Sequence, residues 1–168
     1  HMTIKVALAG AGAFGIKHLD GIKNIPDVQV VSLISRDLAK TQEVADKYGI
    51  KHVTTDLADS LAIKEVDAVI LCTPTQMHAS QTIACLEAGK HVQVEIPLCD
   101  VLAEGENVLA LQQQTGLVAM CGHTRRFNPS HQYVHQKVTA GEFNIQQMDV
   151  QTYFFRRTNM NALGQPRS

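Results

Sequence analysis

The sequence contains no tryptophan, and phenylalanine and tyrosine together make up 5% of its 168 residues. It also lacks any apolar run approaching the roughly 20 residues of a membrane span, and no charged-then-apolar signal segment stands at its N-terminus. Its basic residues are not interleaved with aromatic ones, as they are in many nucleic-acid-binding stripes. We therefore expect a cytoplasmic protein that binds neither membranes nor nucleic acids.

Cysteine is scarce, and its spacing indicates neither disulfides nor zinc. The four cysteines form no C-x-x-C pair, and Cys72, Cys85 and Cys121 lie inside apolar strand or helix patterns, which favours reduced, buried thiols. Four histidines likewise lack metal-ligand spacing to Asp, Glu or Cys. These histidines are His18, His52, His131 and His135. We expect no metal site.

With 168 residues and 45% apolar content, the chain is long enough for one globular domain and the start of another. Its charged residues are unevenly distributed. Residues 1–124 carry 9 Lys and Arg against 14 Asp and Glu, whereas residues 125–168 carry 6 against 2. Five of the six arginines lie in the second segment. Such a cluster favours a compact polyanionic small molecule as ligand.

A glycine-rich loop near the N-terminus has the context of a dinucleotide site. The strand-like run Ile4–Ala9 leads into Gly-Ala-Gly-Ala-Phe-Gly, and a helix-like stretch follows. The glycines permit a tight turn, close approach of a diphosphate and close helix packing, and the helix N-terminus attracts the anion. An ordinary glycine turn is the alternative. The expected cofactor contacts are Gly10, Gly12, Ala13, Phe14 and Gly15.

The end of the second apolar run, Val28 to Ile34, favours NADP over NAD. NAD-binding folds usually place an acidic residue there to bind the ribose hydroxyls, but this chain has Ser35 and Arg36. A hydroxyl and a guanidinium suit a 2'-phosphate. In the alternative reading Asp37 binds the ribose of NAD and Arg36 is solvated. We expect Asp37 instead to cap the following helix.

Six short strands alternate with helices, which predicts an α/β fold with a doubly wound parallel sheet. Glycines follow four of the helices, where left-handed C-terminal caps are expected, at Gly49, Gly89, Gly116 and Gly141. The predicted strands are Ile4–Ala9, Val28–Ile34, His52–Thr54, Ala68–Cys72, His91–Glu95 and Val118–Cys121. The predicted helices are Phe14–Asn24, Leu38–Tyr48, Leu57–Ala62, Gln76–Ala88, Val101–Thr115 and Pro129–Ala140.

The last part of the chain departs from this alternation. Residues 145–157 read as a long strand that no helix returns to the sheet, as in the first strand of an antiparallel α+β domain. We therefore expect a Rossmann domain over residues 1–124 and, over residues 125–168, a connection and the start of a truncated substrate and oligomerisation domain.

In doubly wound sheets, ligands bind beyond the carboxyl ends of the strands. The motifs at the predicted strand ends of this chain resemble those of the glucose-fructose oxidoreductase, inositol dehydrogenase and MocA family (Gfo/Idh/MocA). The resemblance runs from Thr3 to about Arg157, which is essentially the whole chain but only the N-terminal half of a family member. Its motifs are the fingerprint with His18, Thr-Pro-Thr at 73–75 with His78, Gly-Lys-His-Val at 89–92 leading to Glu-Ile-Pro at 95–97, and Arg-Phe-Asn-Pro at 126–129.

The resemblance implies cofactor contacts at the strand ends and a nicotinamide-dependent dehydrogenase. The segments 94–98, 122–129 and 153–157 are similar to those of members that oxidise a cyclic hemiacetal dicarboxylate to a lactone, with NADP as cofactor. Further cofactor contacts implied are Thr73, Pro74, Thr75, His78, Glu95 and Pro97. Among these, His78 is also expected to fix the first turn of its own helix.

One departure from the family pattern concerns proton transfer. Most members have Glu-Lys-Pro, whose lysine lies beside the reacting carbon, but here Ile96 takes that position. The general base must then be another group, which we expect in the absent half. Within this chain His123 is the best candidate. A histidine that only hydrogen-bonds its loop is the competing interpretation.

Two arginine pairs suit a dicarboxylate substrate, because guanidinium groups bind planar carboxylates bidentately. The candidates are Arg125, Arg126, Arg156 and Arg157. Alternatives are a sugar or cyclitol dehydrogenase of the same family and a non-catalytic NADP-binding sensor. Relatives associate through the second domain, so a homodimer formed in this way is expected.

Overall fold

The structure, a computed structural model, describes residues 2–153 of the chain. The chain forms two units, which divide after Thr124. The strands of the first unit are β1 (Ile4–Ala9), β2 (Val28–Ile34), β3 (His52–Thr54), β4 (Ala68–Leu71), β5 (His91–Val94) and β6 (Ala119–Cys121). Its helices are α1 (Ala13–Ile22), α2 (Leu38–Tyr48), α3 (Leu57–Leu61), the short 3-10 helix η1 (Thr75–Met77), α4 (His78–Glu87) and α5 (Leu102–Thr115).

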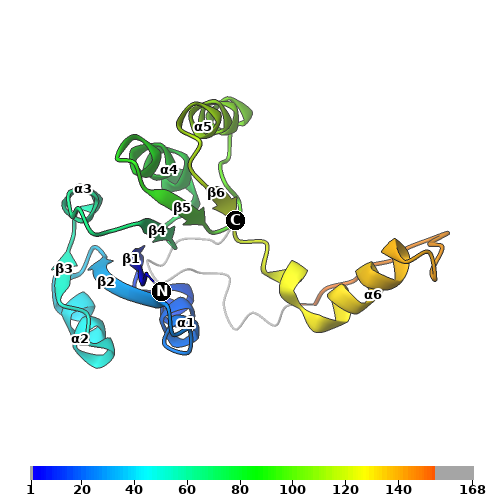
Figure 1. Ribbon diagram of the computed structural model, residues 1–168, viewed down its shortest axis with the longest axis horizontal. Helices are drawn as coiled ribbons and strands as arrows, with labels where there is room; N and C mark the ends of the chain where they lie inside the picture. Colours follow the sequence, from blue (N-terminus) through cyan, green and yellow to red (C-terminus); the bar gives the residue numbers. More distant parts are fainter. Residues whose placement is uncertain (1, 154–168) are drawn as a thin grey trace. The chain divides into compact units, whose positions relative to one another are not determined.

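All six strands form one parallel sheet in the order β3-β2-β1-β4-β5-β6 (Figure 1). The chain runs outward from β1 to β3 and then crosses back, so that β4 pairs with the other side of β1. The order therefore reverses between β1 and β4, which is where doubly wound sheets leave a crevice for ligands. The predicted Rossmann topology is confirmed.

Helices cover both faces of the sheet because its strands are apolar on both faces (Figure 1). Ala7 and Ala9 of β1 pack in a core that includes Leu86 of α4, with side chains of α3 and α5 against it. Leu8, which points to the opposite face, packs with Leu19 of α1 and with α2. Both cores thus converge on β1, the strand that delivers the glycine-rich loop.

The helix ends follow the predicted caps. Asp37 is the N-cap of α2, and its side chain accepts a hydrogen bond from the Lys40 N–H at 3.1 Å. All four glycines expected as left-handed caps have positive φ angles. The helix predicted from Gln76 is preceded by a 3-10 turn, so that α4 begins at His78.

A buried lysine hydrogen-bonds the backbone of the loop that leads into β4. Lys90 is 8% exposed, and its Nζ donates hydrogen bonds to the carbonyls of Ile63 (3.0 Å) and Val66 (2.6 Å). Because an ammonium group is costly to bury without acceptors, these two carbonyls explain why a cation is accommodated between α3 and β4.

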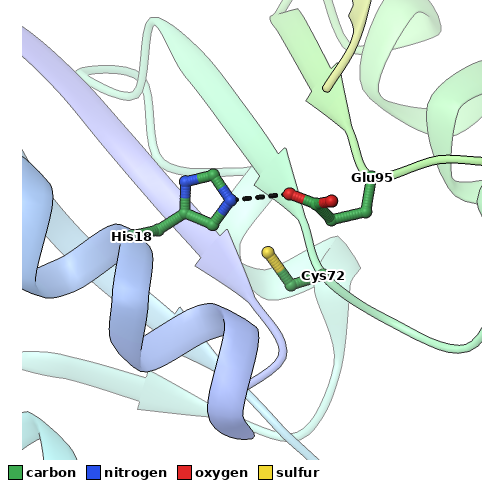
Figure 2. A group of neighbouring side chains, drawn as sticks. All are labelled: His18, Cys72 and Glu95. Carbon is green, nitrogen blue, oxygen red and sulfur yellow. Dashed lines mark hydrogen bonds and ion pairs between the residues drawn. The ribbon is translucent and has the colours of Figure 1, made fainter. Parts of the chain in front are cut away.

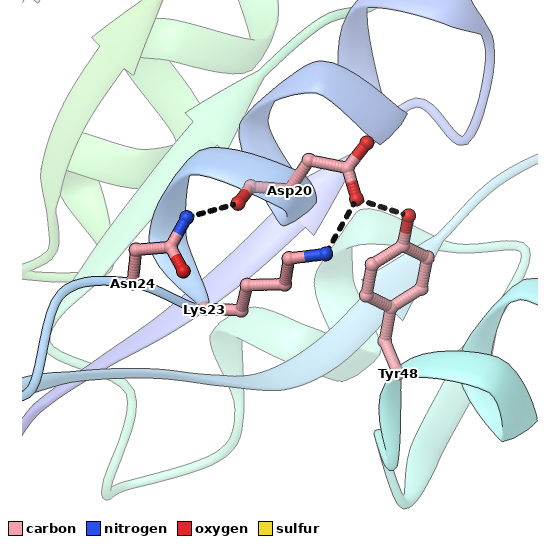
Figure 3. A network of polar contacts seen from close by, with 4 residues as sticks. All are labelled: Asp20, Lys23, Asn24 and Tyr48. Carbon is pink, nitrogen blue, oxygen red and sulfur yellow. Dashed lines mark hydrogen bonds and ion pairs between the residues drawn. The ribbon is translucent and has the colours of Figure 1, made fainter.

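On the surface, a polar network joins the C-terminal parts of α1 and α2 (Figure 3). Tyr48 donates a hydrogen bond to Asp20 Oδ1 at 2.7 Å, and Lys23 Nζ lies 3.5 Å from the same oxygen. The tyrosine hydroxyl and the nearby lysines lower the pKa of Asp20. The carboxylate in turn raises the pKa of Tyr48.

The second unit begins within the 3-10 helix η2 (Thr124–Phe127) and contains α6 (Pro129–Thr139), which Asn128 caps. The strand predicted at residues 145–157 is wrong for residues 145–153, which form no strand, and the rest lies outside the described residues. A strand needs a partner for its backbone hydrogen bonds, and residues 125–153 offer none. Within residues 2–153, no helix combines the length and hydrophobicity needed to cross a bilayer.

A methyl group at Gly10 should disrupt the fold. Gly10 has φ +103°, and a Cβ would lie 2.3 Å from the carbonyl oxygen of Cys72. We expect Gly10→Ala to lower the free energy of unfolding by about 3 kcal/mol in urea denaturation. Gly21→Ala is the control, because a Cβ in that part of α1 meets nothing within 4 Å. Equal stability of both variants would contradict this prediction.

Candidate functional site

A cavity of about 440 Å³ opens at the carboxyl ends of β1, β2 and β4, at the point where the strand order reverses. Its size falls within the range of small-molecule sites. It is lined by residues at three strand ends, in the loops that follow these strands and β3, and at the starts of the next helices, namely Ala9, Gly10, Ala11, Gly12, Ile34, Ser35, Arg36, Thr55, Asp56, Leu57, Cys72, Thr73, Pro74, Met77 and Gln81.

The glycine-rich loop forms one wall, and its three glycines have different environments. Gly10 is pressed against the end of β4, and a Cβ on Gly15 would lie 1.8 Å from the Gly10 carbonyl oxygen. Gly12, in contrast, faces open space, with nothing within 4 Å of a Cβ. Gly12 is also the N-cap of α1, which has no side-chain cap. The N–H groups of the first turn of α1 are therefore open to an anionic ligand.

The opposite wall begins at Ser35 and Arg36, directly after β2. Both residues line the cavity, and Arg36 is exposed. Asp37, the other residue considered for the ribose, uses its carboxylate to cap α2. The cavity also contains Asp56, whose side chain caps α3 by accepting from the Ala58 N–H at 2.9 Å.

The loop after β4 contributes Thr73 and Pro74 to the cavity, while Thr75 begins η1. His78 does not line the cavity, since its side chain is buried and 1% of the residue is exposed. Its ring nitrogens lie 2.7 Å from the Thr73 carbonyl and 2.6 Å from the Pro97 carbonyl. His78 therefore ties the loop after β4 to the loop after β5.

Three side chains meet at the same edge of the sheet (Figure 2). His18 of α1 and Glu95, just after β5, form a hydrogen-bonded pair with 2.8 Å between Nε2 and Oε1. The thiol of Cys72, just after β4, lies with them, and one ligand atom of each residue is within 4.8 Å of the others. Burial, with a contribution from Glu95, raises the pKa of the Cys72 thiol to about 12. Cys72 is thus a neutral thiol near pH 7.

The remaining candidates follow β6. His123 is exposed, and its ring makes no hydrogen bond within residues 2–153. In the second unit, a groove of about 640 Å³ is lined by Arg125, Arg126, His131, Gln132, His135 and Gln136. Arg125 donates to Thr152 Oγ1 at 3.2 Å, and its carbonyl lies 3.0 Å from His131 Nδ1. Arg156 and Arg157 lie outside the described residues.

Sequence reasoning did not foresee some of this arrangement. His18 was noted beside the glycine fingerprint and among the histidines without metal-ligand spacing in the sequence, although the fold brings it close to Cys72 and Glu95. Cys72 was noted as a buried thiol, and Gln81 was not noted. The position of His18 three residues after Gly15 is the available signal, because that spacing sets it nearly one helical turn beyond the fingerprint.

Comparison with known proteins agrees with the fold and the glycine-rich loop. Residues 4–123 match a family model described as "Oxidoreductase family, NAD-binding Rossmann fold", and residues 129–168 match "Bacterial oxidoreductases, C-terminal". The chain belongs to the Gfo/Idh/MocA oxidoreductase family. The resemblance drawn from the motifs is thereby confirmed.

Two curated relatives illustrate the range of the family. The chain is 68% identical, over 98% of its length, to the 4-carboxy-2-hydroxymuconate-6-semialdehyde dehydrogenase of Sphingobium sp. (strain SYK-6), covering 52% of that protein. It is 34% identical, over 82% of its length, to an inositol 2-dehydrogenase of Rhodococcus erythropolis, covering 40% of that protein. The chain thus spans about half the length of these relatives.

Solved structures share the fold. The scyllo-inositol dehydrogenase of Lactobacillus casei, crystallised with NAD(H) and scyllo-inositol, superposes with a TM-score of 0.80 at 29% identity. The match covers 83% of this chain and 42% of that one.

His78 provides a test of how the two loops are held. We expect His78→Leu to lower the free energy of unfolding by about 2 kcal/mol, because it removes the buried imidazole that hydrogen-bonds the Thr73 and Pro97 carbonyls. His78→Gln retains an amide donor and should lose less. Urea denaturation of both variants checks this, and a leucine variant as stable as the unmodified chain would refute the bridging role.

Proposed function

We propose that the complete protein is an NADP-dependent dehydrogenase that oxidises the cyclic hemiacetal of 4-carboxy-2-hydroxymuconate-6-semialdehyde to 2-pyrone-4,6-dicarboxylate, in protocatechuate 4,5-cleavage. The observation that carries the proposal is the 68% identity, over 98% of the chain, to a dehydrogenase named for this semialdehyde. The expected cytoplasmic location and a homodimer formed through the second domain are part of the same proposal.

The cavity fits a dinucleotide. The open space at Gly12 and the uncapped N-terminus of α1 suit the diphosphate. Ser35 and Arg36 suit the 2'-phosphate of the adenosine ribose. The nicotinamide half is assigned to the loops after β4 and β5, with contacts to Thr73, Pro74, Thr75, Glu95 and Pro97. When bound, the cofactor supplies the hydride acceptor.

In this arrangement His78 is a positioning residue. Its buried ring joins the Thr73 and Pro97 carbonyls, so it fixes the two loops that hold the nicotinamide half without contacting the cofactor itself. The sequence had suggested a direct contact, and the burial of the ring supports an indirect one.

The substrate is held by its carboxylates. Arg125 and Arg126 line a groove that also contains His131 and His135, so that donors and positive charge gather at one surface. Bidentate guanidinium contacts to two carboxylates would orient the ring. We assign the same role to one of Arg156 and Arg157, which lie outside the described residues.

Loss of the substrate's hydroxyl proton requires a base, because Ile96 stands where most family members have lysine. A hemiacetal hydroxyl is more acidic than that of a simple alcohol, which reduces the demand on the base. Within this chain His123 is the candidate, since it is exposed beyond β6 with its ring uncommitted among the described residues. The principal base is assigned to the half that the chain lacks.

Cyclitol oxidation is the second candidate, favoured by the 34% identity to an inositol 2-dehydrogenase. Neutral polyols need neutral hydrogen-bonding groups, however, and the groove of the second unit has two guanidinium groups. The arginines and the replaced lysine support the dicarboxylate instead.

The test of the proposed function requires this chain joined to the C-terminal half that its relatives possess. We expect NADP to be reduced when freshly prepared protocatechuate 4,5-cleavage product is added, with a stable pyrone as product, as followed by absorbance of the reduced nicotinamide. Reduction with myo- or scyllo-inositol and none with the cleavage product would favour the cyclitol alternative. Binding of NADP without any turnover would favour a sensor.

The cofactor preference has its own test. The double variant Ser35→Ala/Arg36→Asp should bind NADP about tenfold to hundredfold more weakly, because a charge-assisted contact to the 2'-phosphate is lost. NAD binding should change little. Equal weakening of both cofactors in titrations would contradict a role for Arg36 in reading the phosphate.

A further inference from the structure

His18, Cys72 and Glu95 form a set of donors that the proposed reaction does not use as a unit. They come from α1, the end of β4 and the end of β5, and Figure 2 shows their side chains converging. One ligand atom of each lies within 4.8 Å of the others, and His18 Nε2 is 2.8 Å from Glu95 Oε1. The side chains of His18 and Glu95 are 23% and 14% exposed, so the cluster is sheltered but reachable.

Imidazole, thiolate and carboxylate are the ligands with which proteins bind Zn²⁺. Three such ligands leave a fourth, open position for water in a tetrahedral site. The three elements that carry them are fixed by the sheet and by the packing of α1 on it, so the donors are brought together by folding and not by the ion.

We propose that His18, Cys72 and Glu95 bind a thiophilic divalent cation such as Zn²⁺, and that this cation excludes the dinucleotide. The cation is an inhibitor and takes no part in the reaction. The second half of the proposal rests on the proposed function, which assigns the cavity to the dinucleotide.

Binding of the cation releases a proton from the protein and forms a bond from each of the three side chains to the ion. Cys72 releases its thiol proton to solvent and coordinates as thiolate. The neutral His18 ring transfers its proton from Nε2, where it is donated to Glu95, to Nδ1 and then coordinates through Nε2. The hydrogen bond between His18 and Glu95 is replaced by one bond from each residue to the ion. No redox change occurs, and one proton is released for each ion bound.

Exclusion follows from where the ligands lie. Cys72 lines the same cavity as Gly10, Gly12 and Thr73, and Glu95 is among the residues assigned to the nicotinamide half. An ion on Cys72 brings positive charge and its own water into that cavity and occupies the carboxylate of Glu95. The ion and the dinucleotide therefore compete for the same cavity and cannot be bound at the same time.

The first experiment titrates the 168-residue chain with Cd²⁺, which reports thiolate coordination by ultraviolet absorbance. One equivalent should produce the cadmium–thiolate band, and Cys72→Ser should abolish it. The matched control is Cys99→Ser/Cys121→Ser, which removes the two other partly buried thiols and should keep the band. A band that survives Cys72→Ser, or that disappears only in the control, would overturn the site.

The second experiment separates the ligand set from the thiol alone. His18→Gln retains an amide donor for Glu95 but removes the imidazole, and it should weaken Zn²⁺ binding about tenfold or more in calorimetric titrations. Unchanged Zn²⁺ affinity would overturn the assignment of His18.

Competition is tested by repeating the Zn²⁺ titration at saturating NADPH. The apparent Zn²⁺ affinity should fall, and it should be restored by removing the nucleotide. Unchanged Zn²⁺ affinity with NADPH demonstrably bound would overturn the exclusion. A chain that gives the cadmium band but binds no NADPH would instead contradict the proposed function and leave the metal site standing.

Discussion

The structure depends on the close approach of the β1–α1 turn to the end of β4. A Cβ on Gly10 would lie 2.3 Å from the Cys72 carbonyl oxygen, and one on Gly15 would lie 1.8 Å from the Gly10 carbonyl oxygen. This contact lets α1 start beside the central strands, with its N-terminus at the mouth of the cavity. The same approach brings His18 next to Cys72 and Glu95, so both the dinucleotide cavity and the metal-ligand cluster follow from two glycines.

Positive charge is found in two separate places, one in each unit. Arg36 lines the cavity just after β2, at the position where an acidic residue usually selects NAD. The neighbouring carboxylate of Asp37 is engaged as a helix cap. Arg125 and Arg126 belong to the groove of the second unit. One guanidinium thus suits the cofactor, whereas the pair suits an anionic substrate, and the proposed reaction needs both.

Much of the fold could be predicted because its signals are local. The strand, glycine and helix succession at residues 4–24, the cap at Asp37 and the left-handed glycines each depend on residues that are neighbours in sequence. The convergence of His18 with Glu95 could not, because they are 77 residues apart and meet only through the strand order. Likewise, the burial of His78 and the carbonyls that satisfy Lys90 depend on which loops become neighbours. The strand expected at residues 145–157 does not form over residues 145–153, which have no partner strand within residues 125–153.

The central claim is that the Gly12 surface at the N-terminus of α1 holds the cofactor diphosphate. Titration of the chain with NADPH, followed by nicotinamide fluorescence, tests it directly when Gly12→Ala is compared with Gly21→Ala. A Cβ meets nothing within 4 Å at either position, so both variants should fold normally. The account predicts that Gly12→Ala alone weakens NADPH binding by about tenfold or more. Undiminished binding by a folded Gly12→Ala variant would contradict it.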